Sequence, residues 1–174
     1  MGYTVDKEGI APLPRKLSAI AGFPSPKKQK QLLGFLGAVN YHRRILPKTN
    51  GKTPAQILQP LYTAATETNA RTAVSFEKRW ITENLQTAYE EAKEILMNAC
   101  KLVHLDFNAP IAITTDSSNF AMGGVLEQYS QNKWQPLGFW SKHLPQDKAK
   151  WTRFWRELYA IQQALRAFGT ETQG

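Results

Sequence analysis

Two acidic residues, Asp116 and Glu157, have neighbours that suggest more than a solvated surface. Asp116 ends the apolar run "IAITTD" and is followed by small polar residues. Glu157 belongs to a helical pattern between about 149 and 168, just beyond the edge of an apolar stripe. Two carboxylates that meet where water is scarce repel each other unless cations join them. This pairing is typical of a magnesium site in a nucleic-acid-cutting enzyme.

The elements that would bring these carboxylates together are predicted from alternation, turns and helical spacing. Three strands of an antiparallel meander are expected at about 111–115, 121–128 and 135–141. The helix at about 149–168 follows them, and its apolar stripe is expected to pack across the sheet. That stripe consists of Phe154, Leu158, Ile161, Leu165 and Phe168. Such packing would place Glu157 beside Asp116.

Each of these features also has an ordinary explanation, which the sequence leaves open. Asp116 can hydrogen-bond the backbone of its own turn. Glu157 can pair with Arg153, one helical turn earlier. Gly123 and Gly124 indicate a bulge or a close approach within a strand, because they fit no phosphate-binding glycine motif.

The preceding part of the chain is predicted to be mostly helical. Residues 3–14 are expected to form a hairpin or an edge strand, and residues 26–46 a helix. The run "TPAQ" at 53–56 has the capping-box signature of a shorter helix, which Pro60 is expected to bend or end. A further amphipathic helix is predicted at about 82–98.

Positive charge is concentrated in the first third of the chain. Residues 1–60 hold ten Lys or Arg and two acids, whereas residues 61–174 hold twelve of each, so the first segment carries the whole net charge of +8. This asymmetry indicates a surface that faces a polyanion, with a solvated basic surface as the alternative. Three lysines crowd the start of the 26–46 helix, where the helix dipole disfavours cations: Lys27, Lys28 and Lys30.

Composition argues against several other classes of protein. The single Cys100 rules out an internal disulfide, and three scattered histidines do not suggest a zinc site. No apolar stretch has membrane-spanning length, and the first residues lack the order of a signal peptide. We therefore expect an intracellular protein, cytoplasmic or nuclear, without a membrane partner.

Five blocks, in order, resemble the Pol polyprotein of Ty3/gypsy-type retrotransposons. The run "GIAPLPRKLSAIAGFPSPKKQKQLLGFLGAVNYHRRILP" is similar to the reverse transcriptase thumb region, and "WITENLQTAYEEAKEIL" resembles the linking helix. The runs "ITTDSSNFAMGGVLEQ", "WQPLGFWSKHL" and "WTRFWRELYAIQQAL" resemble the first three strands and first helix of RNase H. The resemblance implies an α+β fold, with a small helical thumb-like domain followed by a truncated RNase H-like unit. That unit would be a three-stranded antiparallel meander plus a covering helix.

The resemblance also suggests a division of the chain into four parts. Residues 64–75, rich in Ala, Thr and Asn, have the composition of a linker. The parts would be the end of a primer-grip-like hairpin (1–14), a helical thumb-like domain (15–63), a linker (64–80), and the linking helix with the truncated RNase H-like domain (81–174). The run "GYTV" matches only loosely the family's hairpin that steadies the primer end.

The family assigns roles to particular positions of this sequence. An Asp at the position of Asp116 and a Glu at that of Glu157 belong to a four-carboxylate site, which holds two Mg²⁺ ions and cuts the RNA strand of RNA–DNA hybrids. The resemblance thus implies that both are catalytic and metal-binding residues. It also implies that five basic residues contact the phosphates of the nucleic acid: Lys27, Lys28, Lys30, Arg43 and Arg44.

Other family features are missing from this sequence. The polymerase's paired aspartates and two of the four RNase H carboxylates are not found, and "GTETQG" after Phe168 departs from the family. We therefore expect a fragment of a polyprotein with nucleotidyltransferase and endonuclease (hydrolase) activities, inactive alone and weak or deficient in Mg²⁺ binding. A non-catalytic nucleic-acid-binding or interaction module is the alternative, and a remnant without a biological role is a third. The strand at 111–115 would become an exposed apolar edge, which predicts self-association besides contact with the remainder of the Pol polyprotein.

Overall fold

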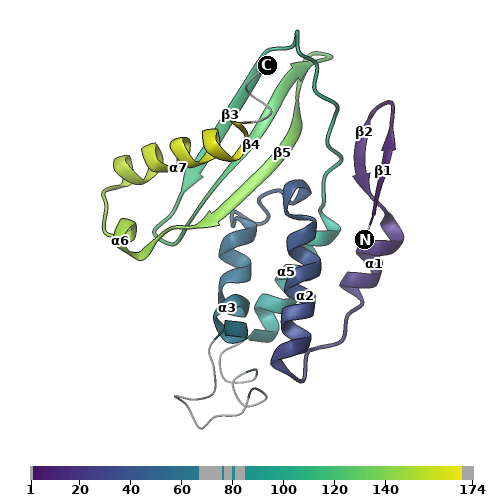
Figure 1. The fold of residues 1–174 in the computed structure, drawn as a ribbon, viewed down its shortest axis with the longest axis vertical. Coiled ribbons are helices and arrows are strands. Elements are labelled where there is room, and N and C mark those ends of the chain that lie inside the picture. Colours follow the sequence, from purple (N-terminus) through teal and green to yellow (C-terminus); the bar gives the residue numbers. More distant parts are fainter. Residues whose placement is uncertain (1, 67–75, 77–79, 81–84, 170–174) are drawn as a thin grey trace.

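The elements fall into two parts, a bundle of helices and a three-stranded sheet covered by one helix (Figure 1). This computed structural model describes residues 2–66, 76, 80 and 85–169. The α+β fold predicted from the sequence is confirmed. Residues 67–75 of the predicted linker, and the first residues of the predicted 82–98 helix, lie outside the described residues.

A two-stranded hairpin opens the chain, as predicted for residues 3–14. It consists of β1 (Tyr3–Asp6) and β2 (Gly9–Pro12). Ile10 exchanges two backbone hydrogen bonds with Leu102, at 2.7 and 2.9 Å. Gly9 has a φ of +151°, and a Cβ at this position would lie 2.0 Å from the Leu102 carbonyl oxygen. Only glycine allows the hairpin to approach this segment so closely.

The helical bundle follows the hairpin. Its elements are α1 (Pro14–Ala21), α2 (Gln29–Tyr41), the 3₁₀ helix η1 (Arg43–Ile45), α3 (Pro54–Thr66) and α5 (Leu85–Met97). The sequence pattern does not predict α1, and the single helix expected at 26–46 is divided into α2 and η1. The side-chain oxygen of Gln31 accepts hydrogen bonds from the backbone N–H groups of Lys27 and Lys28, at 2.8 and 3.1 Å, which satisfies donors at the start of α2.

The third helix begins as predicted but does not end where expected. The Thr53 backbone donates to Gln56 Oε1 at 2.7 Å, and the Gln56 backbone donates to Thr53 Oγ1 at 3.3 Å, which is the expected capping box. The helix then continues through Pro60 to Thr66, so an end at Pro60 is wrong. Apolar burial on both sides of Pro60, at Ile57, Leu58, Leu61, Ala64 and Ala65, compensates for the missing backbone hydrogen bond.

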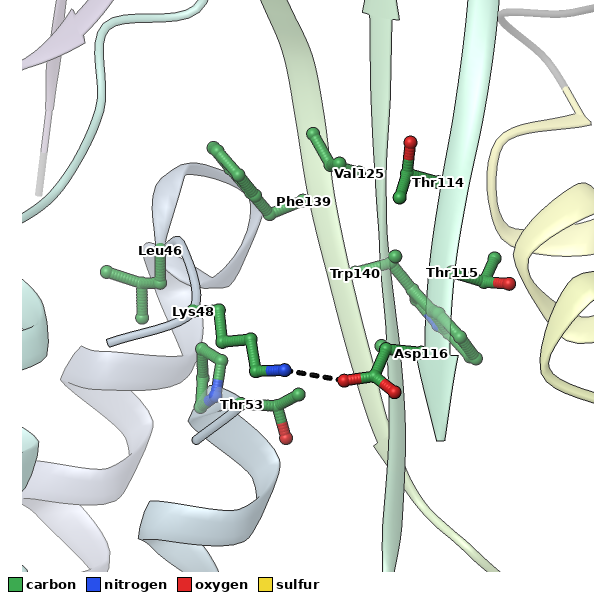
Figure 2. A pocket seen from close by; sticks show the side chains of 12 residues that line it. Leu46, Lys48, Thr53, Thr114, Thr115, Asp116, Val125, Phe139 and Trp140 are labelled. Carbon is green, nitrogen blue, oxygen red and sulfur yellow. Dashed lines mark hydrogen bonds and ion pairs between the residues drawn. The ribbon is translucent and has the colours of Figure 1, made fainter. Parts of the chain in front are cut away.

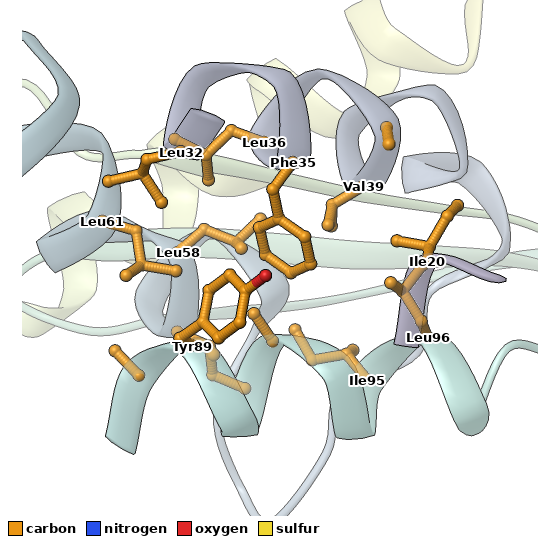
Figure 3. Packing of buried hydrophobic residues seen from close by; sticks show 14 of the residues in the cluster. Ile20, Leu32, Phe35, Leu36, Val39, Leu58, Leu61, Tyr89, Ile95 and Leu96 are labelled. Atoms are coloured by element: carbon orange, nitrogen blue, oxygen red, sulfur yellow. The ribbon is translucent and has the colours of Figure 1, made fainter. Parts of the chain in front are cut away.

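Apolar side chains of α2, α3 and α5 interlock to form the core of the bundle (Figure 3). The rings of Phe35 and Tyr89 lie 4.4 Å apart between centroids, and the Tyr89 hydroxyl donates to the Pro24 carbonyl at 3.0 Å. Helix α5 therefore packs with the bundle, although the chain passes from it towards the sheet. The boundaries proposed for the four parts stay a prediction.

The second part is the predicted meander. Its antiparallel strands β3 (Ile111–Ser117), β4 (Ala121–Ser130) and β5 (Lys133–His143) lie in the order β3-β4-β5. The β4–β5 connection contains Gln131 and Asn132, both with positive φ, as in a two-residue hairpin turn. A short helix, α6 (Gln146–Ala149), leads to α7 (Arg153–Ala167), which crosses one face of the sheet (Figure 1).

Helix α7 contacts the sheet through small residues, which corrects the expected packing face. Of the predicted stripe only Phe168 is buried, whereas Phe154, Leu158, Ile161 and Leu165 are 44–68% exposed. Ala160 and Ala164 are fully buried against the sheet instead. Ala164 lies beside Gly124 on β4, so both surfaces are small and the backbones approach closely. Hydrophobic periodicity identified the apolar residues but not the face that is covered.

Candidate metal and nucleic-acid site

Asp116 lies near the end of β3, where it pairs in register with Gly123. Its side chain points away from α7 and towards the helical bundle, whereas the neighbouring Thr115 points towards α7 (Figure 2). Lys48 Nζ donates to Asp116 Oδ2 at 2.5 Å. The Asp116 side chain is 57% exposed and that of Lys48 is 47% exposed. Asp116 is therefore paired with a cation from the other part of the molecule, and solvent reaches the pair.

Lys48 comes from the loop between η1 and α3, whose shape is fixed by a tight turn. Thr49 and Lys52 exchange two backbone hydrogen bonds at 2.9 Å each. Asn50 and Gly51 between them have φ values of +51° and +77°, as this type of turn requires. Lys52 Nζ pairs with Glu91 on α5 at 2.8 Å. Lys48 thus reaches the sheet, whereas Lys52 holds the turn to the bundle.

A cavity of about 230 Å³ lies beside the ion pair, between the start of α3 and the sheet. Asp116, Lys48 and mainly apolar groups line it, among them Leu46, Pro54, Val125, Phe139 and Trp140. A Cβ at Gly123 would lie 2.9 Å from Thr53 Cγ2, which confirms the close approach predicted for this glycine. Gln56 Nε2 also donates to Ser118 Oγ at 2.9 Å across the same junction.

Glu157 lies on the side of α7 that faces the sheet, because it precedes Ala160 and Ala164 at helical spacing. Arg153 Nε donates to Glu157 Oε1 at 2.7 Å, so the local pairing that the sequence left open is formed. The pKa of Asp116 is lowered mainly by the hydrogen bond from Lys48, with a smaller effect from the charge of Arg153. The guanidinium of Arg153 therefore acts on both carboxylates.

The chemistry of these donors can be compared with the needs of Mg²⁺. Two carboxylates supply the hard oxygen ligands that Mg²⁺ prefers, and this ion commonly keeps its remaining positions for waters and substrate phosphates. Among the residues that the structure describes, no group of three or more His, Cys, Asp or Glu gathers in one place. Asp116 and Glu157 each supply a carboxylate of the kind that Mg²⁺ prefers, but the Asp116 side chain points away from α7, which carries Glu157, so a shared magnesium site stays a prediction.

The five basic residues assigned to nucleic acid are all exposed, but they form two groups. Lys27, Lys28 and Lys30 lie at the start of α2, whereas Arg43 and Arg44 lie in η1 beyond its other end. The 13 residues of α2 separate the groups by about 20 Å at 1.5 Å per residue. Arg44 lies beside Gly138 of β5, near the junction of the two parts.

The sequence pattern did not identify Lys48 as part of the site. It was one of ten basic residues in the first third of the chain, and 68 positions separate it from Asp116. The Asn-Gly pair at 50–51 is typical of a turn but gives no direction for a nearby lysine.

Comparison with known proteins agrees with this architecture. The Tf2-3 and Tf2-4 transposon polyproteins of Schizosaccharomyces pombe are each 30% identical over 168 residues, which are 95% of this chain and 12% of the polyprotein. The chain thus spans about an eighth of the length of these relatives, whose similarity confirms the resemblance to Ty3/gypsy-type Pol polyproteins.

Solved structures match the fold over almost the whole chain. The foamy viral protease-reverse transcriptase in complex with RNA/DNA hybrid is 22% identical, with a TM-score of 0.73 over 97% of this chain and 21% of that one. The same viral protein in complex with dsDNA is 22% identical, with a TM-score of 0.77 over 100% of this chain and 34% of that one.

A family match covers more than half of the chain. Residues 81–174 match the family described as the RNase H-like domain found in reverse transcriptase. In the part of the chain that the structure describes, no helix has the length and apolarity needed to cross a bilayer. The chain belongs to the family of RNase H-like domains found in reverse transcriptases, and it is similar to a section of retrotransposon polyproteins.

Proposed function

We propose that this chain takes part in Mg²⁺-dependent cleavage of the RNA strand of RNA–DNA hybrids, as one section of a retrotransposon reverse transcriptase polyprotein. One observation carries the proposal: Asp116 lies near the end of β3, and Glu157 lies on the sheet-facing side of α7, the helix that crosses the sheet. These are the positions at which the family resemblance expects metal-binding carboxylates. The match to the RNase H-like family supports the assignment.

The roles of the residues follow from their chemistry. Asp116 and Glu157 would hold the metal, which when bound activates water and stabilises the leaving oxygen of the cut strand. Arg153 is 82% exposed, so its guanidinium can turn from Glu157 to a phosphate oxygen of the substrate. Two carboxylates are few for this task, and we propose that the remainder of the Pol polyprotein supplies the others and that this chain alone is inactive.

The partner would be an RNA–DNA hybrid or another nucleic-acid duplex. Lys27, Lys28 and Lys30 at the start of α2 are exposed, and so are Arg43 and Arg44 in η1, where the Arg44 guanidinium lies beside Gly138. Together they account for half of the ten basic residues in the segment that carries the whole net charge of +8. Contacts of this kind weaken with added salt, because binding releases counterions from the phosphates.

A second candidate function is nucleic-acid binding without chemistry. The observation that favours it is that each carboxylate is already neutralised by a basic side chain, Asp116 by Lys48 and Glu157 by Arg153. In that case the basic surface is the functional part, and the sheet serves as a contact surface. Strand β3 ends the sheet with a free edge in the described part of the chain, and Ile111 on it is 43% exposed. We propose that this edge promotes self-association.

The proposal is tested with the polyprotein segment that joins this chain to the sequence following it. Cleavage of a hybrid with Mg²⁺ is expected, and Asp116→Asn and Glu157→Gln should each abolish it. Asp147→Asn is the matched control, because Asp147 pairs with its neighbour Lys148 in the described part of the chain and lies outside the site. Cleavage that survives both site substitutions overturns the proposal. Salt-sensitive binding of the hybrid without cleavage, unchanged by Asp116→Asn, would favour the second function.

A further inference from the structure

We infer that the cavity between the helical bundle and the sheet binds a small, neutral aromatic amide, whose ring fills the apolar part of the cavity and whose amide group meets the ion pair of Lys48 and Asp116. The ligand class comprises benzamide and similar flat rings that carry a carbonyl oxygen beside an N–H group. The inference does not depend on the proposed function, because it involves neither a metal ion nor the cleavage of nucleic acid. It rests on the size of the cavity, the chemistry of its walls and the two charges at its edge.

The size of the cavity suits a single substituted ring. The surfaces of the two parts touch at separate points: a Cβ at Gly123 would lie 2.9 Å from Thr53 Cγ2, and the guanidinium of Arg44 lies beside Gly138. They nevertheless leave a cavity of about 230 Å³ at the junction. A cavity of about 150 Å³ with apolar walls is large enough to bind benzene. The space at this junction therefore admits a benzene ring with one polar substituent.

Apolar side chains from both parts form most of the wall. Leu46 comes from the loop after η1, Pro54 from the start of α3, Val125 from β4 and Phe139 from β5. Leu46 is 1% exposed and is held by the packing of the bundle, whereas Val125 and Phe139 are only partly buried. A flat ring placed here would remove their remaining apolar surface from water, which favours binding. Small-molecule sites commonly have this form, an apolar pocket between domains with a few polar groups.

The ion pair supplies the polar edge of the site. Lys48 and Asp116 both line the cavity, and Figure 2 shows the pair below Leu46, Val125 and Phe139. An ammonium group has three donors, and the hydrogen bond to Asp116 Oδ2 engages one of them. An ionised carboxylate can accept several hydrogen bonds. The pair therefore presents a donor beside an acceptor. An amide is complementary to both, because its carbonyl oxygen can accept from Lys48 and its N–H can donate to Asp116.

The two charges also determine which charge the ligand should carry. The hydrogen bond from Lys48 is the main reason that the pKa of Asp116 lies below its usual range, so the pair is ionised on both sides at neutral pH. A carboxylate ligand would approach Asp116 and a cationic ligand would approach Lys48, and each contact between like charges is unfavourable. A neutral amide avoids both contacts. Solvent reaches the pair, since the Asp116 side chain is 57% exposed, and the ligand can enter from this side.

The first test titrates the chain with benzamide and follows the methyl resonances of leucine and valine by NMR. The methyl groups of Leu46 and Val125 should shift, with a dissociation constant on the order of 1–10 mM, as the small size of the ligand allows. Benzoate and benzamidine have the same ring but carry opposite charges. Each should bind about two- to tenfold more weakly than benzamide, because each loses one of the two hydrogen bonds to the pair.

Methyl groups elsewhere and one substitution show whether benzamide occupies this cavity. Leu158 and Leu165 on the exposed apolar side of α7 report non-specific binding, and their methyl groups should not shift. Thr114→Phe places a ring at the cavity from an exposed position of β3, where phenylalanine suits the strand, so this variant should fold and lose benzamide binding. Shifts at Leu158 and Leu165 alone, or unchanged binding by Thr114→Phe, would overturn the site.

The second test asks whether the ion pair selects the ligand. Lys48→Met leaves the carboxylate alone, so benzamidine should become the tightest of the three ligands. Asp116→Ala leaves the ammonium alone, so benzoate should become the tightest. Lys52→Met is the matched control, because Lys52 borders the same turn but pairs with Glu91, and it should still prefer benzamide. Damage to the fold would weaken all three ligands alike and would not reverse their order. An unchanged order in both variants, or a wild type that prefers either charged ligand, would overturn the inference.

Discussion

The helical bundle and the sheet bury their apolar side chains in different ways. Of the twelve largest fully buried side chains among the residues that the structure describes, all but Met122 and Phe168 belong to the bundle and its loops. The sheet is covered by α7 through Ala160 and Ala164, and large apolar residues of that helix remain exposed. The bundle has a hydrophobic core of its own. Among the described residues, the sheet has two small hydrophobic clusters, and the apolar face of α7 is exposed.

This difference explains why the candidate site lies where the two parts meet. The well-packed bundle holds the Lys48 loop in a fixed position, and the sheet presents Asp116 at the end of an edge strand. A junction with a cavity and an exposed ion pair can rearrange more easily than either core. Substitutions in one part at a time therefore measure how far the stability of each part is independent of the other.

The largest effect is expected from the centre of the bundle. Phe35→Ala removes a ring that is 1% exposed and contacts Tyr89, and it should lower the free energy of unfolding by about 3–5 kcal/mol. Phe154→Ala on α7, where the ring is 68% exposed, should change it by less than about 0.5 kcal/mol. Urea denaturation followed by circular dichroism measures both. Equal losses would show that the sheet is packed as firmly as the bundle.

Substitutions of two glycines provide the next test, which concerns backbone conformation rather than side-chain packing. Gly9→Ala would push a Cβ into the Leu102 carbonyl and should cost about 2–3 kcal/mol, because the positive φ adds strain. Gly37→Ala, in the middle of α2 with open space around it, should stabilise by about 0.5–1 kcal/mol. Thermal unfolding of the two variants should shift in opposite directions. A destabilised Gly37→Ala would mean that α2 is not a regular helix at this point.

Local sequence signals predicted much of this fold. The hairpin, the capping box of Thr53 and Gln56 and the three-stranded meander depend on neighbours within a few residues, and each is present. The covered face of α7 was not predicted, because small residues such as Ala160 carry little hydrophobic signal while they allow the closest approach to a sheet. The continuation of α3 past Pro60 depends on tertiary burial, which local propensity does not contain.

The candidate site was harder to predict from the sequence than the fold was. Asp116 was identified from its place at the end of a predicted strand, Glu157 from its place beside an apolar helical stripe, and both from the family resemblance. Lys48 was not, since an ion pair between distant residues has no local signature. Strand alternation sends Asp116 and Thr115 to opposite faces of β3, but the strand pattern alone does not specify which face meets the bundle and which meets α7.

A smaller effect is expected from the titration of the bundle core at high pH. Burial, and to a lesser degree the charge of Glu90, raises the pKa of Tyr89 to about 12, from 10.0. The folded state therefore retains the phenolic proton where the unfolded chain has lost it. The raised pKa of Tyr89 therefore stabilises the folded state fully below pH 10, and this stabilisation is lost as the pH rises to about 12. Melting temperatures across this range should fall, and Tyr89→Phe should flatten the decline.

The smallest effect on folding, with a distinct effect on association, is expected at the edge of the sheet. Ile111→Lys places a charge on the free edge of β3 and should change the free energy of unfolding by less than about 0.5 kcal/mol, since Ile111 is 43% exposed. A lysine there opposes pairing with the edge of a second copy, so sedimentation should show a lower average mass than in the wild type. Leu33→Lys provides the comparison in the bundle, where a similarly exposed leucine lies on α2 away from any strand edge. That variant should associate as the wild type does. If the wild type sediments as a monomer at every concentration, the free edge does not pair, and the weaker packing of the sheet has no consequence for assembly.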